Sequence, residues 1–537
     1  METKIINNFG GRLTRKLNGD LNSGLAKFST SWGYDPFTKP QNLTWFEQPT
    51  SIVGISDLIL AAKTRQESGV QQVYAISNGD KIYKLQPNSN SNPNLDSVVG
   101  IASIQSGANY KYGASMEFFG NTEKMYITTD NRVYAANFNF TSPSIIGDSG
   151  SISSVAGHVL KPFIGKLLFG NGNTIAAIDA TGTITSSVRG TGQGNIYSEL
   201  NPQLPVSNKV QDVDVSPDGN YLEVTASEVN PEDIANFDFA TPSSGSEGFV
   251  YRWNGIDDGI TSLSKIPSYA VTALQSYLNG NAIFSNDSFG ASLNDGVRKT
   301  ITLPDNRSPL PNATVVNGNF VSWVAPETIG TSSMVGSLYY YGSLDEENPT
   351  GLYRLMRYST PLSNGFVFQT PSNILTNNFS KNLNGSRSSV LTVGYGKHYI
   401  STWDTSDAVN SNYKLLRFLV TSSGTGTPQS GVYETQTEIF SKRKAVLQIR
   451  VYTEPTAANQ GFQLDIIGSN GSIITNGTFT YAFAAGTDES LLQGSLERIN
   501  FTPVIDSIYA LGIRITNTGT VNMTIKKIEV DIDNSGQ

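Results

Sequence analysis

Residues 73–85 read VYAISNGDKIYKL, and this stretch indicates the fold more directly than any other part of the chain. Apolar and polar residues alternate on both sides of Asn78-Gly79-Asp80, as they do in strands that have two unlike faces. Asn, Gly and Asp adopt the positive φ angles of tight hairpin turns at little cost. The stretch therefore predicts two antiparallel strands joined by a turn.

The same pattern recurs along the chain, each time with apolar residues on both sides of a turn made of Gly, Asn or Asp: residues 125–136, 167–179, 213–224, 315–323 and 393–403. Further strand pairs fill the larger gaps. A repeated unit of about four strands is typical of a β-propeller, because one blade cannot bury both of its faces whereas a ring of blades can. We predict an all-β chain whose residues 49–420 form a β-propeller of roughly six or seven blades. A pair of large β-sandwiches or a β-helix is the alternative.

The C-terminal part differs in composition and in strand length. Residues 421–430 read TSSGTGTPQS, which is the composition of a linker. After it the apolar alternation extends further and is cleanest over residues 523–532, where Ile525, Ile528 and Val530 alternate with charged residues. Residues 431–537 are therefore predicted to form a β-sandwich, jelly-roll-like or immunoglobulin-like.

The N-terminal part has little periodicity but many aromatic residues, so residues 1–48 are predicted to be an extended arm that lies on another surface. That surface is either its own domain or a neighbouring subunit. In the first 30 residues, five basic residues outnumber two acidic ones and leave a net charge of +3, whereas the whole chain carries −8. Opposite potentials orient association. We therefore expect the arm to be an assembly element.

Composition excludes several function classes. The chain has 537 residues, enough for two or more domains. A net charge of −8 and the lack of a long basic stripe argue against nucleic-acid binding. The absence of cysteine excludes disulfides, thiolate metal sites and cysteine nucleophiles. The start of the sequence lacks a signal-peptide pattern, and no apolar run reaches the ~18 residues of a membrane span. We expect no membrane insertion.

The residue types that carry catalysis give few candidates. His158 and His398 are the only histidines, and a triad or a two-histidine metal site would need them to meet across 240 positions. Ordinary packing is the expected role of both. The acidic groups that could serve a glycosidase all lie beside turn residues: Asp212, Asp214 and Asp218; Asp257 and Asp258; Asp345, Glu346 and Glu347; Asp404 and Asp407. Acids are common in turns for reasons of solvation and Asx-turn bonding.

Other motifs are weaker still. The Asp212–Asp218 spacing lacks the distal glutamate of a calcium loop, and no phosphate-binding glycine loop stands between a strand and a helix. Tyr339, Tyr340 and Tyr341 could stack on sugar rings, but half of an alternating run must point inward, so core packing is the expected role. We predict no catalytic residue, no metal and no cofactor, and hence no enzyme.

Two segments resemble a known family. Residues 9–24, FGGRLTRKLNGDLNSG, precede an aromatic-rich arm and irregular blades, an arrangement that resembles the propeller-containing virion proteins of tailed bacteriophages. These proteins often carry a Phe-Gly-Gly-type segment before the first blade, here Phe9-Gly10-Gly11. Residues 431–440, 445–455 and 462–467 also look like the sandwich appended to such propellers.

The resemblance implies a structural protein of the tail or head–tail region, assembled in the host cytoplasm into the virion. Its partners would be other virion proteins and further copies of itself, with no nucleic acid and no catalytic residue. Two alternatives stay open. One is an adhesin or tail-fibre module that binds a host surface glycan, and the other is a propeller glycoside hydrolase with a carboxylate pair. Three acids meeting at one mouth of the propeller would favour the hydrolase.

Overall fold

The computed structural model describes most of the predicted strands. The residues that it describes are 1–9, 28–32, 34, 41–45, 50–52, 54, 55, 57, 59–86, 97–108, 114–120, 124–136, 144–147, 152, 158–185, 209–216, 218–227, 248–256, 261–266, 271–277, 280–285, 289–293, 298–301, 321–329, 333–342, 351–357, 366–372, 390–393, 397–404, 412–419, 428, 431–454, 458–483, 491–493 and 496–533. Every regular element in this part of the chain is a β-strand, as the sequence predicts. Within the same residues, no helix has the length and apolar character needed to cross a membrane.

Most of these strands form seven separate four-stranded antiparallel sheets, which we number in chain order. The first four sheets are β5 (Ile59–Glu67), β6 (Val70–Ser77), β7 (Lys81–Gln86) and β8 (Ser97–Ser103); β9 (Ser115–Phe119), β10 (Lys124–Thr128), β11 (Val133–Ala136) and β12 (Ser144–Gly147); β13 (Leu160–Phe163), β14 (Lys166–Asn171), β15 (Thr174–Ile178) and β16 (Ile184–Thr185); β17 (Lys209–Val215), β18 (Leu222–Ser227), β19 (Gly248–Trp253) and β20 (Ser262–Ile266).

The last three of the seven sheets are β21 (Val271–Tyr277), β22 (Gly280–Ser285), β23 (Phe289–Leu293) and β24 (Arg298–Ile301); β25 (Val321–Ile329), β26 (Ser333–Gly342), β27 (Gly351–Arg357) and β28 (Phe366–Ser372); β29 (Val390–Val393), β30 (Lys397–Asp404), β31 (Asn412–Leu419) and β4 (Thr50–Ser51). In the first six sheets each strand pairs with the next one along the chain. Such repeated meanders are typical of propeller blades.

The hairpins follow the sequence pattern that predicted them. In residues 73–85, Val73 pairs with Leu85 and Ile76 with Ile82, so the turn falls at Asn78-Gly79-Asp80. The patterns at 125–136, 167–179, 213–224 and 393–403 likewise form β10–β11, β14–β15, β17–β18 and β29–β30. For the sixth pattern, at 315–323, residues 315–320 lie outside the described residues.

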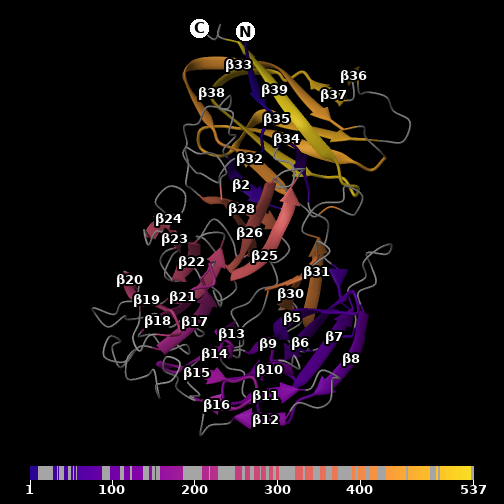
Figure 1. Ribbon diagram of the computed structural model, residues 1–537. Helices are drawn as coiled ribbons and strands as arrows, with labels where there is room; N and C mark the ends of the chain where they lie inside the picture. Colours follow the sequence, from indigo (N-terminus) through magenta and orange to yellow (C-terminus); the bar gives the residue numbers. More distant parts are fainter. Residues whose placement is uncertain are drawn as a thin grey trace.

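The first strand of each sheet contacts the first strand of the next, from β5 through β9, β13, β17, β21 and β25 to β29, and β29 in turn contacts β5. The seven sheets thus lie around a common centre (Figure 1). Apolar side chains fill the space between successive sheets where the structure describes them. Tyr74 and Ile76 pack with Met125 and Tyr134 between the first and second sheets, for example. This is the β-propeller that the sequence predicts, rather than a β-helix or a pair of sandwiches.

The seventh sheet takes its fourth strand from the other end of the chain. Strand β4 pairs with β31, with Ser51 opposite Leu416 and Thr50 opposite Arg417. Strand β4, near the start of the chain, therefore completes the sheet formed by β29, β30 and β31. The pairing covers the edge of β31, which would otherwise be exposed. It also ties the seventh sheet to the segment that precedes the first sheet.

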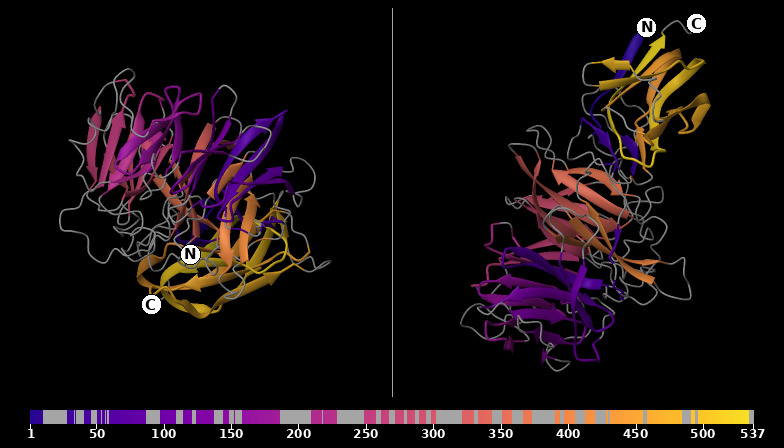
Figure 2. Two further views of the ribbon diagram at one scale, coloured as in Figure 1. Left: turned by 90° about the horizontal axis from the view of Figure 1, so that it is seen from below. Right: turned by 90° about the vertical axis from the view of Figure 1, so that its right-hand side faces the viewer.

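The remaining strands form one eleven-stranded sheet, which we call the C-terminal sheet: β1 (Glu2–Ile6), β2 (Phe28–Trp32), β3 (Leu43–Thr44), β32 (Val432–Thr435), β33 (Glu438–Thr453), β34 (Gly461–Ile467), β35 (Ile473–Ala482), β36 (Leu491–Gln493), β37 (Leu496–Phe501), β38 (Ile505–Asn517) and β39 (Thr524–Asp533). It forms a lobe beside the propeller, with both chain ends on that lobe (Figure 2). Strands β1 and β3 pair with β39, and β2 pairs with β32.

The N-terminal residues also enter the core of this lobe. Ile6, Phe9, Tyr34 and Trp45 are buried in one cluster with apolar residues of β34, β38 and β39. The Tyr34 hydroxyl donates a hydrogen bond of 2.7 Å to the carbonyl oxygen of Phe9. The described residues of the predicted arm, residues 1–48, are thus strands and core residues of the C-terminal sheet, and the propeller lies between the two parts of the chain that form it. The boundaries at 48, 420 and 430 stay predictions.

Candidate functional site

Charged residues of alternating sign lie along the first strands of the propeller sheets. The Nζ of Lys63 on β5 lies 2.5 Å from Oε2 of Glu117 on β9. The Nζ of Lys161 on β13 lies 2.9 Å from Oδ1 of Asp214 on β17. Oδ2 of Asp212, also on β17, accepts a 2.9 Å hydrogen bond from the backbone N–H of Leu274 on β21. We call these residues, Lys63, Glu117, Lys161, Asp212 and Asp214, the inner-strand cluster.

The sequence of β17, KVQDVDV, explains the position of the two acids. Val210 and Val213 are buried in the cluster between the third and fourth sheets. The strand register shifts between Val210 and Asp212, a local irregularity that redirects the side chains which follow. Since side chains alternate along a strand, Asp212 and Asp214 then lie on the face opposite Val213. The predicted pair of acids is therefore brought together by one strand.

Burial and charge act on the cluster in opposite directions. Burial raises the pKa of Asp212 to about 7, although the Leu274 N–H and the Lys161 ammonium act to lower it. Burial acts to lower the pKa of Lys161, but the negative charges of Asp214 and Asp212 outweigh it, and the pKa of Lys161 is raised. Lys161 therefore keeps its proton and its positive charge within the cluster.

A third acidic residue of the fourth sheet, Glu223, is buried next to the cluster. Glu223 on β18 lies opposite Asp214 in the strand ladder and is fully buried. Its Oε1 lies 2.6 Å from Nε of Arg252 on β19, while its Oε2 has no hydrogen-bond partner among the described residues. Burial raises the pKa of Glu223 to about 7, against the opposing charge of Arg252. The sequence patterns do not point to Glu223 or Arg252, because their contact depends on the pairing of β18 with β19.

These contacts account for the position of each acid without a substrate. A catalytic carboxylate pair has to face a bound sugar across a gap. In the inner-strand cluster, Glu117 and Asp214 instead bond to lysines of neighbouring sheets. Asp212 bonds to the backbone of Leu274 in the fifth sheet. These ion pairs and this hydrogen bond hold adjacent sheets together.

Among the other acids that the sequence identifies, Asp218 is the one whose side chain the structure describes. Asp218 lies in the β17–β18 turn, where its Oδ1 accepts hydrogen bonds from the Ser216 hydroxyl (2.5 Å) and the Asn220 backbone (3.2 Å). This is the Asx-turn role expected of an acid at that position. Asp404 lies on β30 and the three tyrosines lie on β26, with side chains outside the described part. The remaining acids lie outside the described residues: Asp257, Asp258, Asp345, Glu346, Glu347 and Asp407.

His158 has a packing role. It is buried, with Nδ1 2.6 Å from the carbonyl oxygen of Gly170 in the third sheet and Nε2 3.2 Å from that of Asp130 at the edge of the second. His398 lies on β30 in the seventh sheet, so the two histidines belong to different sheets. In the described part of the chain, no group of three or more metal-binding side chains comes together.

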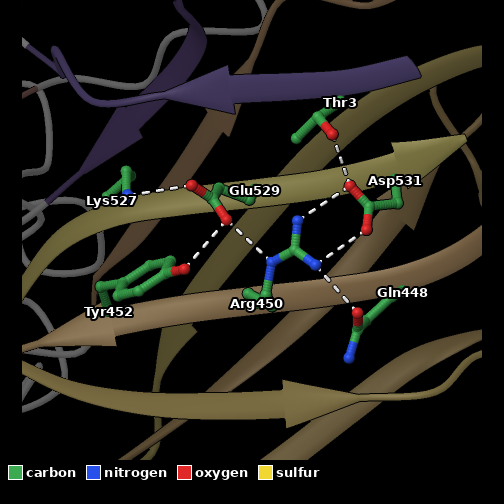
Figure 3. Close-up of polar contacts among 7 residues, drawn as sticks. All are labelled: Thr3, Gln448, Arg450, Tyr452, Lys527, Glu529 and Asp531. Atoms are coloured by element: carbon green, nitrogen blue, oxygen red, sulfur yellow. Dashed lines mark hydrogen bonds and ion pairs between the residues drawn. The ribbon is translucent and has the colours of Figure 1, made fainter. Parts of the chain in front are cut away.

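A polar network also joins the chain ends in the C-terminal sheet (Figure 3). Arg450 on β33 donates to both oxygens of Asp531 on β39, at 2.8 and 2.9 Å, and to Glu529 at 2.7 Å. Asp531 also accepts a 2.7 Å hydrogen bond from the Thr3 hydroxyl on β1. The network is completed by Gln448, Tyr452 and Lys527. Burial acts to raise the pKa of Glu529, but its bonds to Lys527, Arg450 and Tyr452 outweigh it and lower the pKa.

Comparisons with known proteins give only distant structural likeness. No protein family and no curated protein matches the sequence. Among solved structures, the Dos1 propeller covers 78% of this chain and 97% of its own, at 8% identity and a TM-score of 0.40. The Cps50 (Swd1) β-propeller domain of Myceliophteria thermophila covers 70% and 100%, at 10% identity and a TM-score of 0.41. Both of these structures are β-propellers by name, and at these TM-scores the likeness carries no argument about this chain.

Proposed function

We propose that this protein is a non-enzymatic structural component of a tailed-phage virion, in the tail or head–tail region. The observation that carries the non-enzymatic part is the inner-strand cluster, in which Glu117, Asp212 and Asp214 are each bonded to a neighbouring sheet. Each of these bonds joins two sheets of the ring. The virion part of the proposal is supported by the sequence resemblance at Phe9-Gly10-Gly11 and residues 431–467.

The finer architecture belongs to the same proposal. We take the seven four-stranded sheets as the seven blades of one closed propeller, supported by the cyclic contacts of the first strands and by the β4–β31 pairing. We take the C-terminal sheet as a jelly-roll-like sandwich. This is supported by the long strands β33 and β38, each of which pairs with several other strands along its length. Closure of this kind leaves only the outermost strand of each sheet with an open edge, which suits a protein that has to persist in a particle.

The proposed partners are other virion proteins and further copies of this chain, met during assembly in the host cytoplasm. We propose no contact with nucleic acid and no membrane insertion. Two other functions would use the same fold: binding of a host surface glycan and hydrolysis of a glycan. A glycan array and a screen of chromogenic glycosides and bacterial polysaccharides test them. Turnover that a single Asp212→Ala or Asp214→Ala change abolishes would replace the structural proposal with the hydrolase.

The virion role is tested by removing the protein during phage growth. A stop codon early in its gene, in a phage grown on suppressor and non-suppressor hosts, should give incomplete particles by electron microscopy only on the non-suppressor host. Complementation with the full chain should restore complete particles. Complete, infectious particles without the protein would contradict a structural role.

A further inference from the structure

Strand β8 is the outermost strand of the first sheet and has unusual chemistry for that position. Its sequence, SVVGIAS, contains no charged residue and no proline. Within the part of the chain that the structure describes, β8 pairs only with β7, so its outer edge has no strand beside it. Val99 and Ile101 lie on the same side and are 48% and 56% exposed. An uncharged, apolar and exposed edge strand favours pairing with another strand.

The outermost strands of the other sheets differ from β8. Lys265 lies in β20, Arg298 and Lys299 lie in β24, and Pro371 lies in β28. The outermost strands β16 and β4 have only two residues each, and β12 has four. Charges, prolines, short length and β-bulges are devices by which proteins protect sheet edges. Strand β8 has seven residues and, of these devices, has only the irregularity at Val99.

We propose that β8 is a self-association surface, where it pairs antiparallel with β8 of a second copy of this chain about a two-fold axis at Gly100. An isologous contact of this kind must be self-complementary. The sequence meets this condition: Ser97 lies opposite Ser103, Val98 opposite Ala102, and Val99 opposite Ile101 of the other copy. The first sheets of two copies then form one continuous sheet.

The chemistry of the strand favours a second copy over a foreign strand. The two-fold axis brings identical residues near one another, and β8 has no charge that could repel itself across the axis. The exposed Val99 and Ile101 meet each other as apolar cross-strand pairs in both halves of the contact. Gly100 at the axis has no side chain to hold two backbones apart.

One local feature limits the ladder. The register of β7 and β8 shifts between Lys84 and Leu85, so Val99 lies in an irregularity of the first sheet. From Gly100 to Ser103 the pairing with β7 is regular. The contact is a single strand pair, and small interfaces of this kind give weak, concentration-dependent association.

Analytical ultracentrifugation of the full chain, from about 1 to 100 μM, tests the proposal. We expect a reversible monomer–dimer equilibrium, and we expect Ile101→Lys to raise the dissociation constant at least about tenfold, because it replaces the apolar pair with Val99 by a charge opposite an apolar residue in both halves of the contact. Ile256→Lys is the matched control, because Ile256 is 64% exposed but lies in the connection that follows β19 of the fourth sheet. Circular dichroism shows whether each variant is folded.

Cross-linking gives a second readout that does not depend on Ile101→Lys folding. The chain has no cysteine, so Val99→Cys with Ile101→Cys introduces the only two thiols. Oxidation should give a covalent dimer on a non-reducing gel, and Ile256→Cys should not. A monomer at every concentration would overturn the proposal. So would a dimer that persists in Ile101→Lys and fails to cross-link at β8. Either result leaves the virion proposal standing, because other surfaces could contact other virion proteins.

Discussion

The hydroxyl of Thr3 donates a 2.7 Å hydrogen bond to the carboxylate of Asp531, a residue 528 positions further along the chain. The same carboxylate accepts hydrogen bonds from both terminal nitrogens of Arg450. Strand β1 is therefore held to β39 by side chains as well as by the backbone ladder from Glu2–Ile532 to Ile6–Ile528. The two ends of the chain form one structural unit, and the propeller is inserted between them.

This arrangement predicts the behaviour of a chain cut at the linker. The sequence alone suggests that a protease cutting within residues 421–430 would release a separate C-terminal domain. With a specific protease site inserted there, we expect the two fragments to stay together in gel filtration, because β1, β2 and β3 remain paired with β39 and β32. They should separate only in denaturant. Separation of the cut fragments in native buffer would mean that the N-terminal strands do not hold the C-terminal sheet.

The Arg450–Asp531 pair predicts a large effect of one charge removal. The Asp531 side chain is only 2% exposed, so Arg450→Met leaves a buried carboxylate without its main partner. We expect a loss of about 2–4 kcal/mol in the free energy of unfolding, measured by urea denaturation. Lys526→Met is the control, since the Lys526–Glu454 pair is more exposed and should change stability by less than about 1 kcal/mol. Equal effects of the two changes would contradict a structural role for the network.

The N-terminal strand predicts a contrast between neighbouring residues. Ile6 is fully buried in the core of the C-terminal sheet, whereas Ile5 is 39% exposed on the other face of β1. Ile6→Ala should lower the unfolding free energy by about 2–4 kcal/mol, and Ile5→Ala by less than about 1 kcal/mol. Thermal unfolding followed by circular dichroism measures both. If Ile6→Ala is as harmless as Ile5→Ala, the strand is not part of the core and the N-terminal residues are free for assembly.

The buried carboxyl group of Glu223 predicts how stability depends on pH. Its pKa is about 7 in the folded protein against an ordinary value of 4.5, so between these values the folded state binds the proton more tightly than the unfolded state. The contribution of Glu223 is therefore largest below about pH 4.5 and is lost as the pH rises to about 7.

The test replaces the ionisable group by a neutral one of the same shape. Glu223→Gln should remove about 2–3 kcal/mol of the stability difference between pH 5 and pH 8. Glu454→Gln makes the same substitution on a more exposed carboxylate and is the matched control. Urea denaturation at the two pH values measures both variants. A Glu223→Gln profile parallel to that of the parent protein would show that this carboxyl group does not titrate in the range.

The sequence predicted what local chemistry determines. The Asn78-Gly79-Asp80 turn and its relatives specify hairpins from adjacent residues, and the structure confirms the hairpins of five of the six patterns. The pairing of β4 with β31 and of β1 with β39 joins residues hundreds of positions apart. Nothing near Thr50 or Glu2 in the chain specifies such a partner. The sequence therefore predicts residues 1–48 only as an extended arm that lies on another surface.

The candidate site was predictable to the same local extent. The sequence identifies Asp212, Asp214 and Asp218 as candidates because they are acids beside a turn. It does not identify Lys161, whose partner lies on a neighbouring sheet, or Arg252, whose partner lies on the next strand of the same sheet. Arg450 could have been found from the alternating charges of residues 526–531, had the sequence shown that β33 lies beside them.

Quantitative peptide mass spectrometry of purified phage particles tests the central claim most directly. If a tailed phage encodes this chain, as proposed, particles purified from its lysate should contain the peptides of the chain at a fixed ratio to the other tail and head–tail proteins. That ratio should survive washing in high salt, since the protein is proposed to be built into the particle. Absence of the peptides from particles, with the protein recovered only in the soluble fraction, would contradict the account.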